Sequence, residues 1–294
     1  RTTDPRDGAA IQSLVEEAEA LGPGRIYGGS NTNWGLRERA GKVPVYAVLL
    51  ASDADALGFV GRTTSLSSDF EVEFDDANST QYELFGVRYL ILAVPRLPRV
   101  PATLLDRQGG YTLWEVETGG YIDVVDTVSP AIEADRTNLL AQAGFFLTSD
   151  LLREARYPTI AFAGQRAAPP SLRSGEEPSG SAGSVQHEDA APTDGEFVGE
   201  VVAHRTALVI LRSSFDPRWE VTVDGVSVPP EMVAPSFVGA TVPAGEHTVV
   251  FRYRPFPRYD LLFAIGALTF VGLWVGPGRV ERARSRRRER DEAT

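Results

Sequence analysis

Cysteine is absent from this chain of 294 residues, which contains three histidines and a single methionine. The chain therefore forms no disulfide, no cysteine-ligated zinc or iron–sulfur centre and no thiol nucleophile. Serine-based acyl transfer would have to use His187, His204 or His247, and no Gly-x-Ser-x-Gly elbow accompanies any of them. The glycine-rich stretches lack the third glycine or the lysine of a nucleotide-binding loop. We therefore expect no bound cofactor and no metal site.

Basic residues are scarce outside the C-terminus. Residues 279–294 carry seven arginines and four acidic residues, so the rest of the chain is more acidic than the formal net charge of −11 indicates. A nucleic-acid surface needs clustered lysine and arginine to neutralise phosphates. The acidic main part of the chain argues against nucleic acid as a partner.

A strongly apolar run without charge extends from Leu261 to Val275. Fifteen helical residues cover roughly 22 Å, short of the ~30 Å hydrocarbon core unless the flanks extend the helix. A buried helix would need a protein shell, and little chain remains to supply one. Tyr259 before the run, Trp274 near its end and the arginines behind it are typical of a membrane helix. We predict a transmembrane helix over 257–278, with the lipid bilayer as partner, a basic cytoplasmic tail over 279–294 and residues 1–256 extracytoplasmic.

Export of residues 1–256 requires a signal that this sequence does not contain. The chain starts at Arg1 without an initiator methionine, and no signal peptide occurs within it. We expect it to be a piece of a longer protein whose upstream membrane segments drive export.

The amino-acid composition of the predicted extracytoplasmic part indicates two domains joined by a linker. Residues 164–196 are rich in Gly, Pro, Ser, Ala and charge, with almost no large apolar residue, and are predicted to be a flexible linker. Before it, an amphipathic helix over 11–21 and several strand-like runs, 43–50 among them, predict a mixed α/β domain over 1–163. After it, six short strand patterns predict a small antiparallel β-sandwich over 197–256. The fold class is thus α+β, with one C-terminal transmembrane helix.

The stretch from Phe215 to Val228 predicts a hairpin. An Asp224-Gly225 turn would pair Val223 with Val226 and Val221 with Val228, which places the apolar residues on one face. Asp224 is explained by its tolerance of a positive φ, so the acidic residues of this stretch are interpreted as structural.

Two stretches of the sequence contain residues suited to binding a sugar or a sugar diphosphate. Asp53-Ala-Asp55 matches the Asp-x-Asp form that can hold a metal–diphosphate, but helix capping explains it more simply, as it does Asp75-Asp76. The second is a glycine-rich loop whose aromatic faces and amide groups could stack on a sugar and bond its hydroxyls. We predict carbohydrate binding there by Tyr27, Asn31, Asn33, Trp34 and Arg37. The alternative is that Trp34 simply covers the helix from Ala9 to Leu21.

The segments SSFDPRWEVTVDGVSVPP and FVGATVPAGEHTVVFRYRP, followed by an apolar helix, resemble the C-terminal part of YfhO-type bacterial membrane proteins. These are multi-pass proteins with a glycosyltransferase-C (GT-C) architecture. QYELFGVRYLILA, residues 81–93, and YTLWEVE, residues 111–117, are similar to that family's helix-then-strand element and the strand after it. The aromatic-Pro-Gly that precedes the Trp in the family is here Phe215-Asp216-Pro217-Arg218.

The resemblance implies the outer-face region of a membrane glycosyltransferase in the bacterial cell membrane, acting on envelope glycans or lipid-linked sugars. In such enzymes the essential acidic residues lie in early outer loops, so catalytic residues would be upstream of Arg1 and this region would support the reaction or bind the acceptor. The alternative is a non-catalytic, membrane-anchored envelope protein that binds a protein or polysaccharide partner.

Overall fold

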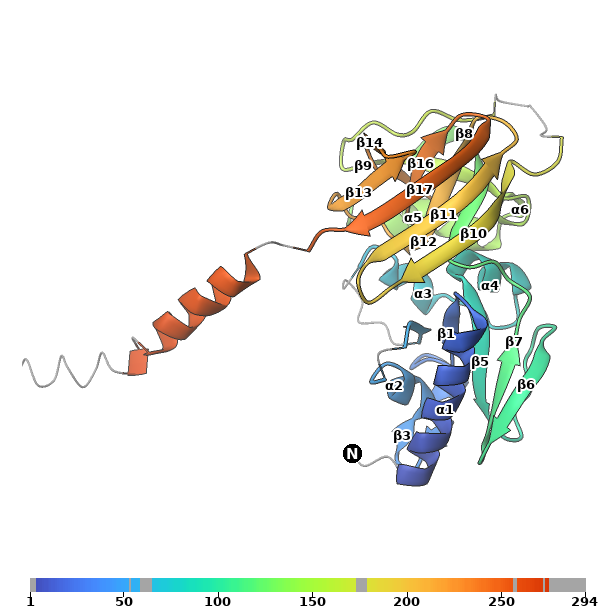
Figure 1. The fold of residues 1–294 in the computed structure, drawn as a ribbon, viewed down its shortest axis with the longest axis vertical. Helices are drawn as coiled ribbons and strands as arrows, with labels where there is room; N and C mark the ends of the chain where they lie inside the picture. Colours follow the sequence, from blue (N-terminus) through green and yellow to red (C-terminus); the bar gives the residue numbers. More distant parts are fainter. Residues whose placement is uncertain are drawn as a thin grey trace, which may run out of the picture. The chain divides into compact units, whose positions relative to one another are not determined.

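The computed structural model describes residues 4–52, 54–58, 65–172, 179–255, 258–271 and 273–274. The chain forms two compact units, residues 1–253 and 254–294. The first is a mixed α/β structure with several sheets (Figure 1).

The N-terminal half of the first unit is built on a five-stranded sheet of order β4-β1-β5-β7-β6. Its strands are β1 (Arg25–Tyr27), β4 (Ala56–Leu57), β5 (Val87–Ala93), β6 (Thr103–Gln108) and β7 (Tyr111–Glu115). β4, β1 and β5 are parallel, and β7 and β6 add in antiparallel register. A two-stranded ribbon, β2 (Arg39–Ala40) with β3 (Val43–Pro44), lies outside this sheet.

The central strand β5 is buried on both faces. Tyr89 and Ile91 belong to one hydrophobic cluster, whereas Leu90 and Leu92 belong to another, as the two-residue period of a strand requires. α1 (Pro5–Leu21) covers the first face with Ile11, Leu14, Val15 and Ala18. The predicted amphipathic helix over 11–21 is therefore confirmed, and it begins earlier because Asp4 caps it and accepts a hydrogen bond from the Arg6 N–H at 2.9 Å.

Short helices complete this half: η1 (Trp34–Leu36), α2 (Val45–Leu49), α3 (Ser68–Val72) and α4 (Ser79–Phe85). The expected strand over 43–50 is wrong after Pro44. Val45, Tyr46 and Leu49 turn one helical face into the core, so packing overrides the β propensity of the valines. Asn78 caps α4 in place of Asp75 or Asp76, and its side chain accepts the Thr80 N–H.

The C-terminal half pairs a closed barrel with an open sheet, and both contribute to one hydrophobic core. The barrel order is β12-β16-β15-β9-β8, with β8 (Ile122–Ala134), β9 (Arg156–Phe162), β12 (Ala207–Ser214), β15 (Glu231–Val233) and β16 (Phe237–Val242). The antiparallel sheet order is β10-β11-β17-β13-β14, with β10 (Gly183–Ala191), β11 (Glu196–Ala203), β13 (Trp219–Val223), β14 (Val226–Val228) and β17 (Gly245–Tyr253). α5 (Leu139–Ala143), η2 (Gly144–Thr148) and α6 (Asp150–Arg153) connect the parallel strands β8 and β9.

This arrangement corrects two predicted boundaries. β8 and β9 precede residue 163, yet they close a barrel with strands that follow residue 197, so no separate sandwich begins at residue 197. The predicted linker is wrong over residues 183–191, which form β10 and pair with β11 along its length. The composition of this segment does not predict a strand, because β10 is an edge strand in which polar side chains face solvent.

The predicted hairpin is confirmed. Val223 pairs with Val226 and Val221 with Val228, and Asp224 has φ 53°. One detail differs, because Val226 is 66% exposed and the apolar face ends at Val228.

The second unit contains helical residues 259–271 and 273–274, whose large apolar side chains are not covered by residues of the same unit. Among the described residues, no helix combines the length and the apolar character needed to cross a membrane. Residues 256–257, 272 and 275–278 of the predicted span and its flank, and the predicted tail 279–294, lie outside the described residues.

Candidate ligand-binding cleft

The structure brings together three of the five predicted carbohydrate-binding residues. The Asn33 amide donates to the Tyr27 hydroxyl at 2.6 Å, and the rings of Tyr27 and Trp34 meet edge to face at 5.8 Å. Tyr27 is only 1% exposed, and burial strongly raises the pKa of its hydroxyl. Asn33 Oδ1 accepts the N–H groups of Ser30 and Gly35. These three side chains hold the loop in shape.

Among the described residues, no side-chain hydrogen bond or ring contact joins the other two predicted residues to this cluster, although the Arg37 backbone N–H donates to the Trp34 carbonyl at 2.9 Å. The side-chain oxygen of Asn31 is buried and has no hydrogen-bond partner among the described residues. Arg37 follows η1 and is exposed. Trp34 packs on the core that contains Tyr27 and Phe74, not on the core that contains α1, which contradicts the alternative interpretation of Trp34 as a cover for that helix.

Charged groups that the sequence did not indicate surround Trp34. Its indole N–H donates to Asp76 at 2.6 Å, and the Arg96 guanidinium lies 4.1 Å from the ring centroid. Asp76 also accepts from Arg99 at 2.7 Å, and Arg96 pairs with Glu38. The loop follows the carboxyl end of β1, the edge where ligands commonly bind parallel sheets. Its aromatic face is nevertheless covered by protein groups.

A cavity of about 660 Å³ lies at the opposite ends of the parallel strands, between the two halves of the first unit. We call it the tyrosine cavity. Its lining comes from α1, from the residues preceding β1 and β4, and from β10 and the turn after it. The residues that line it include Gln12, Glu19, Asp55, Tyr89, Tyr121, Glu188, Asp189 and Thr193. The segment predicted to be a linker thus supplies one wall of the cavity.

The connection from α1 to β1 is packed tightly at this cavity. Gly24 has φ 147°, and a side chain there would place its Cβ 2.5 Å from the Cβ of Arg88. Only glycine allows β1 to approach β5 so closely at this end of the sheet. The floor of the cavity is therefore fixed by backbone geometry.

Glu188 joins β10 to the start of β8. Its two carboxylate oxygens accept the N–H groups of Tyr121 at 2.8 Å and Ile122 at 3.1 Å. Burial raises its pKa, although these two hydrogen bonds favour the ionised form and oppose that shift. Glu188 therefore acts as a fixed acceptor that holds the cavity wall in place.

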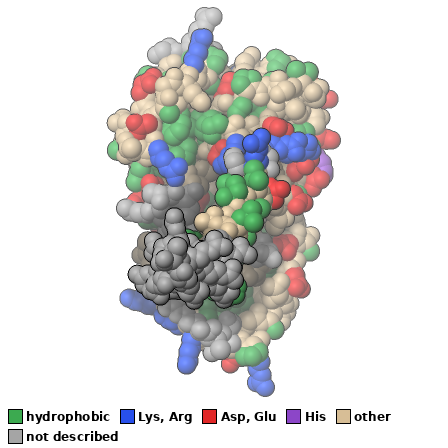
Figure 2. All heavy atoms as spheres, turned by 90° about the vertical axis from the view of Figure 1, so that its left-hand side faces the viewer, with side chains coloured by type: hydrophobic (Ala, Val, Ile, Leu, Met, Phe, Trp, Pro, Cys, Tyr) green, Lys and Arg blue, Asp and Glu red, His purple; other side chains and the backbone are tan. Residues whose placement is uncertain are grey.

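A second cavity, of about 420 Å³, adjoins the first, since Asp55 and Pro192 line both. We call it the arginine cavity. It contains three guanidinium groups, two carboxylates, serine hydroxyls and aromatic rings, from Arg25, Arg136, Arg218, Asp55, Asp216, Ser213, Ser214, Phe215, Trp219 and Tyr253. The face shown in Figure 2 carries basic, acidic and hydrophobic side chains interspersed.

Arg25 stands where the two cavities meet. It donates to the Phe85 carbonyl at 2.7 Å, pairs with Asp55 at 3.1 Å and lies 5.2 Å from the ring centroid of Tyr121. Burial raises the pKa of the neighbouring Glu71, an effect that the positive charge of Arg25 opposes. Asp55, one half of the Asp-x-Asp match, is thus engaged by an arginine, and Asp53 lies outside the described residues.

A fully buried arginine connects the two halves beneath the cleft. Arg212 donates to the carbonyls of Gly120 at 2.8 Å and Ile122 at 3.3 Å, and it pairs with Asp123 at 2.8 Å and with Glu83. Burial raises the pKa of Asp123, and the charge of Arg212 opposes that rise. No local pattern indicates this group, because its four partners lie far from Arg212 along the chain.

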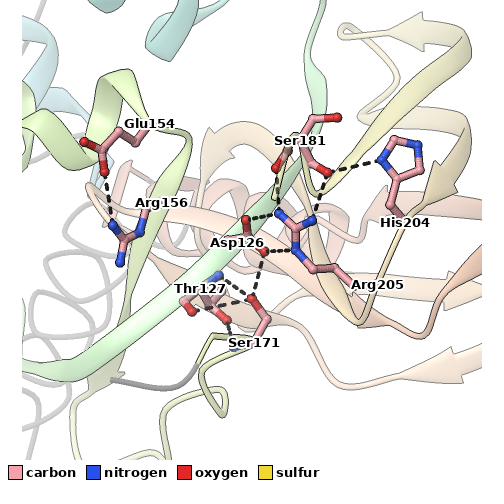
Figure 3. Close-up of polar contacts among 9 residues, drawn as sticks. Asp126, Thr127, Glu154, Arg156, Ser171, Ser181, His204 and Arg205 are labelled. Carbon is pink, nitrogen blue, oxygen red and sulfur yellow. Dashed lines mark hydrogen bonds and ion pairs between the residues drawn. The ribbon is translucent and has the colours of Figure 1, made fainter. Parts of the chain in front are cut away.

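Arg205 and His204, drawn in Figure 3, both contact the Ser181 carbonyl in the segment before β10. Arg205 binds Asp126 through two hydrogen bonds of 3.0 and 2.6 Å, and Ser171 lies 3.4 Å from the same carboxylate (Figure 3). His204 instead contacts the Ser181 carbonyl at 3.1 Å. The histidine therefore does not face the serine and the aspartate, and the arrangement is not that of an acyl-transfer triad.

The part of the chain that the structure describes contains no group of three or more His, Asp or Glu side chains placed to hold a metal ion. Comparison with models of protein families, with curated proteins and with solved structures finds no match. The site is therefore interpreted from its own geometry.

Proposed function

We propose that this chain is the outer-face, glycan-binding region of a GT-C-like membrane glycosyltransferase of the bacterial cell envelope, where it holds an acceptor glycan or a lipid-linked sugar while transfer occurs elsewhere in the protein. The observation that carries the binding role is the tyrosine cavity. The transferase setting is supported by the order of strands, turns and apolar helix from Phe215 onward.

The lining of the tyrosine cavity suits a sugar. A volume of about 660 Å³ lies within the range of small-molecule sites. Carboxylates, the Gln12 amide and the Thr193 hydroxyl can each bond sugar hydroxyls, whereas Tyr89 and Tyr121 are almost fully buried in the lining. Glu188 and Gly24 fix the wall and the floor before any ligand arrives, which reduces the entropic cost of binding.

The same geometry favours binding over catalysis within the cavity. Two of the four carboxylates are engaged by the protein, because Asp55 is paired with Arg25 and Glu188 accepts two backbone N–H groups. A glycoside-cleaving site needs one carboxylic acid and one free carboxylate facing each other across the bond. This observation also favours the alternative function, a non-catalytic membrane-anchored envelope protein that binds polysaccharide.

We also infer membrane attachment through residues 257–278, with 1–256 outside the cell and 279–294 in the cytoplasm. The uncharged run 261–275 and the arginines after it support this orientation. Protease added to intact cells should degrade residues 1–256 and spare an epitope placed in the tail. Digestion of the tail epitope would contradict the orientation.

Calorimetric titration of the chain with chitobiose, mannobiose and cellobiose tests the binding role. At least one disaccharide should bind, and Gln12→Ala with Asp189→Asn should weaken it about tenfold, the loss expected for removing one or two good hydrogen bonds. Gln142→Ala with Asp150→Asn, exposed residues on α5 and α6, is the matched control and should bind as the wild type does. Equal loss in both double variants would contradict the site.

Glycosyl-transfer assays on the full-length protein in bilayers distinguish a transferase with a supporting outer region from a non-catalytic binding protein. For a transferase with a supporting outer region, the cavity variants should raise the KM for acceptor and leave kcat nearly unchanged. Unchanged binding with no transfer from any lipid-linked donor would favour the non-catalytic alternative.

A further inference from the structure

The arginine cavity differs from the tyrosine cavity in charge. Its lining holds three arginines and two aspartates, an excess of positive charge within a chain of formal net charge −11. Among the residues that the structure describes, four carboxylates and no arginine or lysine line the tyrosine cavity. Two adjoining cavities of opposite character therefore share one cleft.

Arg25 and Arg218 are held in place by protein contacts. Arg25 is fixed by Phe85, Asp55 and the ring of Tyr121. Arg218 binds Asp216 through two hydrogen bonds of 2.9 Å and lies 5.3 Å from the ring centroid of Tyr253. A guanidinium whose position is already set loses little entropy when it binds an anion, and its five N–H donors suit phosphate and carboxylate oxygens.

The aromatic wall adds a second kind of contact. Tyr253 is partly exposed and packs edge to face on the buried Trp219 at 5.3 Å, while Trp219 donates its indole N–H to the Ser214 carbonyl at 3.0 Å. Phe215 is buried in the same wall. A sugar ring beside Tyr253 would thus lie within reach of the guanidinium groups.

We propose that the arginine cavity is an anion subsite that binds the phosphate or carboxylate group of an acidic sugar, with Arg25, Arg136 and Arg218 as its cationic residues. The placement of neutral sugars next to it rests on the glycan-binding function proposed above; the anion subsite itself does not. Because Asp55 and Pro192 line both cavities, a glycan with an acidic residue next to neutral ones spans the cleft.

Titrations of the chain with glucose 1-phosphate, glucuronate and methyl glucoside test the subsite. One of the two anionic sugars should bind at least about tenfold more tightly than the neutral glycoside, and the one that binds identifies the anion as phosphate or carboxylate. Raising the salt concentration should weaken that binding. Equal binding of all three sugars, or none by either anionic sugar, would overturn the proposal.

Three variants locate the binding and separate it from a structural effect. Arg218→Gln and Arg136→Gln should each weaken the anionic sugar about tenfold, because each removes a charged donor. Asp216→Asn should strengthen it severalfold, because it removes a negative charge from the cavity, whereas a structural defect would weaken it. Arg153→Gln, an exposed arginine paired with Asp150 at 3.0 Å on α6, is the matched control and should leave binding unchanged.

These experiments distinguish failure of the anion subsite from failure of the function proposed for the tyrosine cavity. If glucose 1-phosphate binds and depends on Arg218 while no neutral disaccharide binds, the anion subsite stands and the function proposed for the tyrosine cavity fails. If Arg218→Gln and Arg153→Gln bind the anionic sugar equally well, the subsite is wrong even where disaccharides bind.

Discussion

Single residues in this protein connect segments that are distant in the sequence, and Arg212 does so most fully. Its side chain has 0% exposure, and its partners come from α4, from the segment before β8 and from β8 itself. A buried guanidinium is tolerated because carbonyl groups and carboxylates surround it. If its charge were lost, Asp123 and Glu83 would face each other without compensation.

Replacing this arginine tests that role. We expect Arg212→Met to lower the free energy of unfolding by about 2–3 kcal/mol, because it leaves buried carbonyl acceptors without a donor while Glu83 and Asp123, 42% and 32% exposed, keep part of their hydration. Urea denaturation followed by circular dichroism measures the change. Arg153→Gln, at an exposed pair, should change it by less than about 1 kcal/mol. A loss for Arg212→Met no larger than that of the control would contradict the role.

At the scale of elements, the hairpin β13–β14 is joined to β17 by a polar contact at its turn. Asp224 accepts from His247 at 2.7 Å and from the Thr248 N–H at 2.9 Å. These hydrogen bonds, that of His247 first, hold the pKa of Asp224 below its ordinary value of 3.8. A carboxyl group with a lowered pKa in the folded state adds stability above its unfolded pKa, and that stability is lost as the pH falls through the folded value.

Asp224→Asn isolates this contribution. Asparagine tolerates the positive φ and keeps an acceptor for Thr248, so the change removes mainly the charge. The wild type should have the higher Tm at pH 5–7, and its advantage should shrink as the pH falls below about 4. Thermal unfolding at pH 7, 5, 4 and 3 measures the difference. A difference that stays constant over this range would exclude the carboxylate as its source.

Residues 1–253 form one compact unit, and its barrel combines two strands that precede residue 163 with three that follow residue 206. β8 pairs with β12 on one side and β9 with β15 on the other. A fragment that ends at residue 163 would leave these edges unpaired and part of the core exposed.

A comparison of two fragments tests this interdependence. We expect residues 1–253 to unfold in one cooperative transition and residues 1–163 alone to lack dispersed amide resonances, because the barrel cannot close. Urea titration and two-dimensional NMR spectra of both fragments provide the measurement. A folded fragment 1–163 with native-like dispersion would show that the two halves are independent domains.

Elements whose signals extend over only a few residues are predictable from the sequence. The helix that follows Asp4, the hairpin at Asp224-Gly225 and helix α4 all depend on caps, turns and periods that operate over a few residues. It could not determine that Val45–Leu49 is helical or that 183–191 is a strand, because packing and an edge pairing decide these against local propensity and composition.

Only the tertiary structure decided the site. Three of the five predicted residues, Tyr27, Asn33 and Trp34, contact one another, but whether they face a ligand depends on Asp76 and Arg96, which lie far along the chain. The two cavities are lined by residues from Gln12 to Tyr253. The cleft forms where segments distant in the sequence pack side by side. The charge of its walls depends on residues from these segments, which no local sequence pattern groups together.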